Sequence, residues 1–204
     1  LGPPEEAKSE KLLQVLAEMP MASFIDGDQD ARDFSHSALG KVRLMKLFWK
    51  AIQVVDNLTD DLGLNPGTAF FNWLSAQLHG VGIQTNADLL RRLQTVPSGL
   101  QLRPDRTDRE ITDTDTYGRL IMVAADITTE TKVEFPRMAE LYWADPDRVN
   151  PACFARASMS IPFFFHPFRV DHCPQDRAKW KALADFGGQP PESVLFMDGG
   201  IMSN

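Results

Sequence analysis

Apolar residues recur at helical spacing near the start of the chain. Residues 9–19 place four apolar side chains on one face of a helix: Leu12, Leu13, Leu16 and Met19. A polar, glycine-containing stretch at residues 26–34 then breaks the pattern. The sequence therefore predicts a first amphipathic helix that ends before this stretch.

Two further helices are predicted from their end signals. Asn65 can act as a helix cap, Pro66 suits the first helical position, and Gly80 suits the stop after an apolar run. The next helix is expected to begin at Thr85, because Asp88 follows three residues later as an acidic variant of the capping box.

Residues 41–55 combine basic and apolar side chains in a pattern that predicts another helix. The basic residues are Lys41, Arg43, Lys46 and Lys50, and the apolar ones include Leu44, Leu47, Phe48, Trp49 and Ile52. Such a helix either packs its apolar side on the protein core or lies on an anionic membrane surface. The segment is the best candidate in the chain for peripheral membrane contact.

The second half of the chain has a different pattern. Residues 119–135 predict two strands joined by a tight polar turn. A short helix with Asn150 as cap and Pro151 at its first position follows, and a later helix is expected to stop at Gly187. The apolar run at 194–197 predicts a final buried strand. Strands interspersed with helices indicate the α/β class.

Composition narrows the range of functions. The 204 residues suit one domain, or most of one, and 43% hydrophobic with 24% charged residues is typical of a globular protein. A net charge of −7 argues against nucleic acid as a partner, since that role requires a basic face. Cys153 and Cys173 form no CxxC pattern, and reduced thiols are the simpler interpretation.

No motif in the sequence predicts a metal or a cofactor. Asp26, Asp28 and Asp30 have the opening spacing of a calcium loop, but Ala31 and Ser37 occupy the positions that require Gly and Glu. The four histidines form no ligand pair at helical spacing. Neither G-x-x-x-x-G-K nor G-x-G-x-x-G is present, which argues against a phosphate-binding or dinucleotide-binding protein.

An acidic residue directly follows the final apolar run. Asp198 stands before Gly199 and Gly200, so its carboxylate is expected at the end of a buried strand, on a sharp turn. Side chains at strand ends form the active sites of many α/β proteins. The alternative is that Asp198 only starts a turn, since Asp-Gly is a common turn pair.

A cluster of aromatic residues precedes this strand by about thirty residues. Phe163, Phe164, Phe165 and Phe168 lie in a segment that also contains two prolines and a histidine. The cluster either fills the core or forms an apolar wall for an acyl chain beside the active site.

Three segments, taken together and in order, resemble the patatin-like phospholipase family. The first is Ala124-Ala125-Asp126, similar to the family's Ala-Thr-Asp strand end. The second is the Arg-Ala-Ser-x-x-Ile-Pro segment at residues 156–162, and the third is Asp198-Gly199-Gly200, closely followed by Asn204. The resemblance covers about residues 119–204.

The resemblance implies a three-layer α/β/α sandwich with lipid acyl hydrolase activity, acting on phospholipids or other acyl esters without a cofactor. It implies one domain, with residues 1–118 as a mainly helical cap or variable region and 119–204 as the strand-rich part. The expected location is the cytoplasm or a membrane surface.

The same resemblance implies a catalytic Ser-Asp dyad in which Asp198 is the base. The family's serine lies in a G-x-S-x-G elbow, preceded by a glycine-rich loop that forms the oxyanion hole, and this sequence contains neither motif. We therefore expect the chain to be truncated, with its nucleophile upstream of Leu1, to be inactive alone, and to fold poorly alone. The alternative is a non-catalytic lipid- or protein-binding relative, or an inactive fragment.

The remaining residue roles implied by the resemblance are fewer. Gly199 and Gly200 form the turn of the Asp motif, and Phe163 to Phe165 line an acyl pocket. Arg156 and Ser158 are expected to be structural, with Arg156 pairing with a carboxylate to hold its helix against the site.

Overall fold

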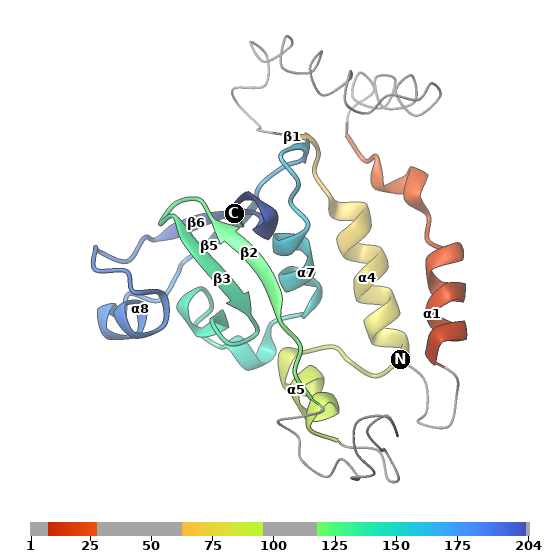
Figure 1. The fold of residues 1–204 in the computed structure, drawn as a ribbon, viewed down its shortest axis with the longest axis horizontal. Helices are drawn as coiled ribbons and strands as arrows, with labels where there is room; N and C mark the ends of the chain where they lie inside the picture. The colour runs from red at the N-terminus through yellow and green to blue at the C-terminus, as the bar shows by residue number, and fades with distance from the viewer. Residues whose placement is uncertain (1–7, 28–62, 96–117, 203–204) are drawn as a thin grey trace, which may run out of the picture.

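A four-stranded antiparallel sheet lies to one side of the protein, with helices beside it (Figure 1). The computed structural model describes residues 8–27, 63–95 and 118–202. The strands lie in the order β3-β2-β6-β5, and every neighbouring pair is antiparallel. Their bounds are β2 Met122–Asp126, β3 Thr131–Phe135, β5 Phe168–Asp171 and β6 Ser193–Asp198. Because β6 has a partner on each side, its backbone is fixed along its length.

The register of the strands separates the two faces of the sheet. Residues directly opposite each other in an antiparallel pair share a face. The pairs Thr131–Asp126 and Asp126–Phe196 therefore place Phe196 on the same face as Val133 and Phe135. Val133, Phe135 and Phe196 are almost completely buried and belong to one hydrophobic cluster.

Two helices, α7 (Ala152–Ser158) and α8 (Arg177–Ala184), pack on this face. The ring of Phe154 in α7 stacks on Phe135 with centroids 4.8 Å apart. Trp180 of α8 meets Tyr142 edge-on at 5.3 Å, and Tyr142 in turn contacts Phe196. The described helices thus supply a layer over one face of the sheet, and the predicted α/β class is confirmed.

A second group of elements packs outside α7. Helix α4 (Thr68–Gly80) contacts α7, and the 3-10 helix η1 (Met21–Phe24) contacts α4 through the ring of Phe24. Helix α1 (Lys8–Ala17) lies beyond them, at the edge of the molecule (Figure 1). A separate parallel pair joins β1 (Gly63–Asn65) to β4 (Phe163–Phe165).

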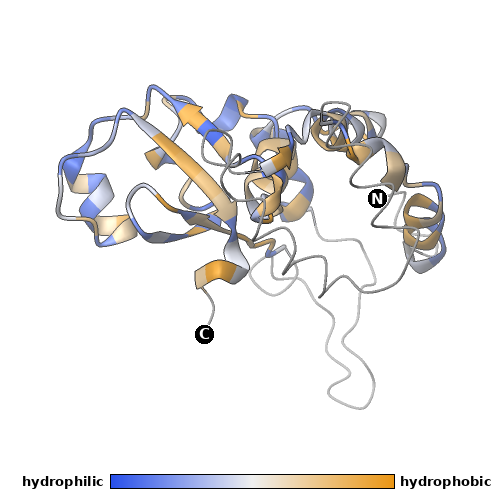
Figure 2. Cartoon of the chain, turned by 90° about the horizontal axis from the view of Figure 1, so that it is seen from above, coloured by the Kyte–Doolittle hydropathy of each residue, from blue (hydrophilic) through white to orange (hydrophobic). Residues whose placement is uncertain are grey.

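The remaining described elements are short. They are α5 (Asn86–Gln94) and the 3-10 helices η3 (Ala139–Leu141), η4 (Pro146–Arg148) and η5 (Gly199–Met202). Figure 2 shows that hydrophobic colour is concentrated in the central strands and the helices beside them, while the outer loops are hydrophilic.

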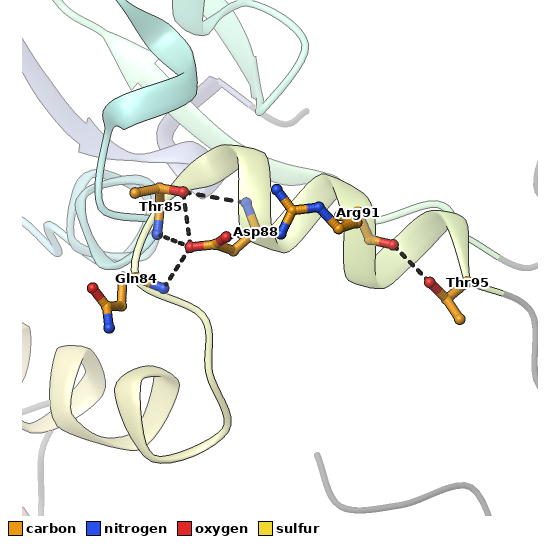
Figure 3. A network of polar contacts seen from close by, with 5 residues as sticks. All are labelled: Gln84, Thr85, Asp88, Arg91 and Thr95. Carbon is orange, nitrogen blue, oxygen red and sulfur yellow. Dashed lines mark hydrogen bonds and ion pairs between the residues drawn. The ribbon is translucent and has the colours of Figure 1, made fainter.

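Several local predictions are confirmed. The first helix is present as α1, and the hairpin is present as β2 and β3. Thr85 caps α5 in a complete capping box with Asp88 (Figure 3). The predicted short helix is present as α7, although it begins at Ala152 with Pro151 in the capping position; the Asn150 carboxamide oxygen accepts a hydrogen bond from Ala152 N at 2.9 Å.

The prediction of Asn65 as a helix cap is wrong. Helix α4 begins at Thr68 after Gly67, whose φ of 74° is left-handed. Asn65 instead ends β1 and is fully buried, where its side chain accepts from Gly27 N and donates to the Phe164 carbonyl. Pairing with β4, a hundred residues away in sequence, decides the role of this asparagine.

Two other boundaries also differ from prediction. Helix α8 ends at Ala184, before Asp185 in a left-handed conformation, and not at Gly187. The aromatic segment around Phe164 was not predicted as strand, yet it contributes β4 and leads into β5.

Some predictions fall outside the described residues. The basic amphipathic segment 41–55 and most of the acidic stretch at 26–34 are among them. Within the described ranges, none of the helices combines the length and the apolar character needed to cross a bilayer.

Candidate active site

Asp198 is the last residue of β6, and its backbone and side chain are both held in place. Its N–H donates to the carbonyl of Ser160 at 2.9 Å. One carboxylate oxygen, Oδ1, accepts from Gly200 N at 2.8 Å. The side chain is half-buried, so the carboxylate is oriented by the turn while it remains accessible.

The two glycines after Asp198 are required by close contacts. A Cβ atom on Gly199 would lie 2.5 Å from the Val123 carbonyl oxygen, and one on Gly200 would lie 2.7 Å from the Asp198 Oδ1. Cβ atoms in protein structures essentially never lie this close to another atom. A larger residue at position 199 would therefore displace β2, and one at position 200 would displace the Asp198 carboxylate. The Gly-Gly pair therefore lets η5 fold back tightly against β2 beside Asp198.

Asp198 lines a cavity of about 390 Å³. This volume lies in the range of small-molecule sites. The lining is mixed, with an acidic, a basic and a hydroxyl side chain among small and apolar ones: Val123, Lys132, Ser158, Asp198, Gly199, Gly200 and Met202. A cavity of this composition can hold a ligand that has both apolar and polar parts.

Ser158 contributes the hydroxyl among the described lining residues. Its Oγ donates to the Val123 carbonyl at 2.7 Å, which ties the end of α7 to β2. The hydroxyl proton that a nucleophilic serine would transfer to a base is therefore engaged in this hydrogen bond. The geometry is consistent with the structural role expected for Ser158.

Arg156 is buried and stabilises the segment that carries Ser160. Its guanidinium donates to Ser160 Oγ at 2.6 Å and to the carbonyls of Pro66 and His166 at 2.6 and 2.8 Å. Burial lowers the pKa of Arg156 to about 10, so the side chain is charged at neutral pH, and nearby Asp26 opposes that shift. The expected carboxylate partner is thus replaced by two carbonyls and a hydroxyl.

The three phenylalanines predicted to line an acyl pocket form β4. Phe165 is buried with its ring 5.3 Å from the Arg156 guanidinium carbon, while Phe164 is partly exposed. Phe163 to Phe165 are not among the lining residues of the Asp198 cavity. Their role in acyl binding stays a prediction.

Asp126, in the first family-like segment, has surroundings unlike those of Asp198. It is completely buried at the end of β2 and accepts hydrogen bonds from Thr128 N, Thr129 N, Thr129 Oγ1 and the Tyr142 hydroxyl. Burial raises its pKa, and the hydrogen bonds oppose that shift. Asp126 therefore stabilises the β2–β3 turn.

Three cavity residues, Val123, Lys132 and Met202, were not recognised from the sequence. Lys132 occupies the exposed position of an alternating strand, which in sequence is indistinguishable from an ordinary surface lysine. Only the fold brings it to the cavity that Asp198 lines.

These features define an α/β protein with an accessible carboxylate in a cavity at the end of a central strand. The chain belongs to the patatin-like phospholipase family, whose family model matches residues 4–204. The family assignment made from the three sequence segments is confirmed.

A curated relative is also similar to this chain. The uncharacterized protein YqhO of Bacillus subtilis (strain 168) is 24% identical over 182 residues, which are 88% of this chain and 44% of that protein. The chain thus spans less than half the length of this relative. No solved structure matches the chain significantly.

Proposed function

We propose that the protein is a lipid acyl hydrolase in which Asp198 is the general base of a Ser-Asp dyad. The observation that carries the proposal is the placement of the Asp198 carboxylate. Asp198 ends a strand that pairs with β2 at this end, its carboxylate is oriented by Gly200 N, and the residue lines a cavity. Membership of the patatin-like phospholipase family supports a lipid ester as the substrate.

The chemistry requires such a carboxylate. A serine hydroxyl is a weak nucleophile until a base takes its proton. In the proposed mechanism, Asp198 accepts that proton as the serine oxygen attacks the ester carbonyl, and it gives the proton to the leaving alcohol as the acyl-enzyme forms. Asp198 then accepts a proton from the water that attacks the acyl-enzyme and returns it to the serine oxygen as the fatty acid is released. A carboxylate fixed at a strand end keeps the geometry that proton transfer needs.

We propose that the nucleophilic serine is supplied by polypeptide outside these 204 residues. None of the serines in the sequence lies in G-x-S-x-G. Ser158, which also lines the cavity, donates a hydrogen bond to the Val123 carbonyl. The limited share of the relative's length that the chain covers leaves room for a further segment.

A non-catalytic lipid-binding relative is the second candidate. It is favoured by one observation: the hydrogen bond described for the Asp198 carboxylate is donated by a backbone N–H and not by a hydroxyl. The two candidates differ in whether the complete protein turns over an ester.

The test is Asp198→Asn in the complete protein, assayed with a chromogenic ester and with phospholipid. Asparagine keeps the shape and the bond from Gly200 N but cannot accept the serine proton, so we expect kcat to fall by about 10³-fold. The matched control is Asp171→Asn on the neighbouring strand β5, where an exposed carboxylate pairs with Arg169. The control should retain activity, and a folded Asp198→Asn protein with unchanged turnover would reject the dyad.

A further inference from the structure

The backbone of Asp198 is held differently on the two sides of β6. On one side, Asp198 pairs with Ala124 of β2. On the other side, the pairing with β5 runs from Ser193 to Phe196 and stops two residues before Asp198. The Asp198 N–H instead donates to the Ser160 carbonyl at 2.9 Å. Ser160 therefore takes the place of a strand partner at the residue that carries the proposed base.

Ser160 is in turn held by its own side chain. It is completely buried in the segment directly after α7. Its hydroxyl donates to the Arg156 carbonyl at 2.8 Å and accepts from the Arg156 guanidinium nitrogen Nη1 at 2.6 Å. Because both bonds of the hydroxyl go to one residue, the position of Ser160 depends on where Arg156 lies.

The Arg156 guanidinium is anchored by segments outside α7. Its other terminal nitrogen, Nη2, donates to the carbonyls of Pro66 and His166 at 2.6 and 2.8 Å. The guanidinium carbon also lies 5.3 and 5.9 Å from the ring centres of Phe165 and Phe168. A planar guanidinium with both terminal nitrogens bonded and a ring beside it has little freedom to move. It therefore fixes Ser160 relative to the β1–α4 connection and to the residue after β4.

We propose that Arg156 is a positioning residue for the Asp198 carboxylate and acts through Ser160. The inference rests on the proposed function and names the residue that aligns its base. The guanidinium fixes the Ser160 hydroxyl, the Ser160 carbonyl fixes Asp198 N, and the end of β6 then sets the direction of the carboxylate. Arg156 is not among the lining residues of the cavity, so it affects turnover without touching the ester.

The test substitutes the two residues of this link in the complete protein. Arg156→Lys keeps the positive charge, but one ammonium nitrogen replaces a fork whose two nitrogens bind different acceptors. Ser160→Ala keeps the carbonyl that Asp198 N binds and removes only the hydroxyl. The matched control is Asn150→Ala at the opposite end of α7, where the carboxamide bonds to the start of α7 and to α4.

We expect kcat for a chromogenic ester to fall by about 10- to 10²-fold in each of the two variants, the scale of a misplaced catalytic group, while KM changes little. The double variant should be no slower than the slower single variant, because both substitutions break the same link. Adding Arg156→Lys to Asp198→Asn should cause no further loss of kcat. Asn150→Ala should keep the kcat of the wild type, although it removes two hydrogen bonds at α7.

Hydrogen exchange at the Asp198 amide gives a readout that does not depend on activity. NMR measures its rate relative to that of the Val194 amide on the same strand, and this ratio removes changes in global stability. The ratio should rise by at least about tenfold in Arg156→Lys and in Ser160→Ala, because the Ser160 carbonyl holds the Asp198 N–H less firmly. It should stay at the wild-type value in Asn150→Ala.

Three results would overturn the proposal. They are a further loss of kcat when Arg156→Lys is added to Asp198→Asn, an unchanged exchange ratio in the link variants, and a loss of kcat in Asn150→Ala as large as theirs. If Arg156→Lys does not fold, Ser160→Ala alone and in the Asp198→Asn background decides the same points. Unchanged turnover in Asp198→Asn would reject the dyad, whereas the exchange ratio tests the link by itself, so the two failures are distinguishable.

Discussion

Two aspartates end neighbouring strands of the same sheet, and their surroundings give them different roles. Asp126 is completely buried and accepts four hydrogen bonds, so its oxygens are occupied by the turn that they stabilise. Asp198 is half-buried, accepts from Gly200 N and lines a cavity. A base must have an accessible oxygen for the incoming proton, and this requirement favours Asp198 over Asp126 as the proposed base.

The buried Asp126 should make stability depend on pH. Burial raises its pKa above the ordinary value of 3.8, so the folded protein binds this proton more tightly than the unfolded chain does. The contribution of Asp126 to the free energy of unfolding therefore increases as the pH falls through the raised pKa, and it is complete below the ordinary value of 3.8.

Urea unfolding of the wild type and Asp126→Asn at pH 7 and at pH 4, close to the ordinary pKa of 3.8, measures this effect. Asparagine does not titrate, so the stability of the wild type relative to the variant should be greater at pH 4 than at pH 7. A difference that stays constant, or that shrinks at pH 4, would contradict the assignment.

The start of a helix can be predicted from sequence when the residues that cap it are close neighbours in the chain. The start of α5 depends on residues within four positions of each other: Thr85 Oγ1 accepts from Asp88 N, and Asp88 Oδ2 accepts from Thr85 N (Figure 3). Such signals are readable from sequence because no distant segment is needed. Asn65 carries a similar local signal, yet its pairing in β1 and its bonds to Gly27 and Phe164 override it.

The capping box predicts a measurable loss of stability. Thr85→Ala removes the hydroxyl that accepts from Asp88 N, and we expect the free energy of unfolding to fall by about 1 kcal/mol. Thr95→Ala, at the other end of α5, is the control, because its exposed hydroxyl only donates to the Arg91 carbonyl. Equal effects of the two substitutions in urea unfolding would show that the cap has no special role.

At the scale of the whole molecule, distant segments converge on one buried cation. Arg156 binds the Pro66 carbonyl ahead of α4, the His166 carbonyl after β4, and Ser160, whose own carbonyl accepts from Asp198 N. The order of motifs in the sequence was enough to predict the family and Asp198 as the candidate base. It could not predict this convergence or the cavity position of Lys132, because both depend on contacts between residues far apart in the chain.

The most direct test of the central claim is labelling of the complete protein with a fluorophosphonate, which reacts preferentially with activated serines. Mass spectrometry locates the modified residue in the wild type and in Asp198→Asn. If Asp198 activates a serine supplied by another segment, a serine other than Ser158 is labelled in the wild type, and this labelling is lost in the variant. Equal labelling of both proteins, or a label on Ser158, would contradict the account.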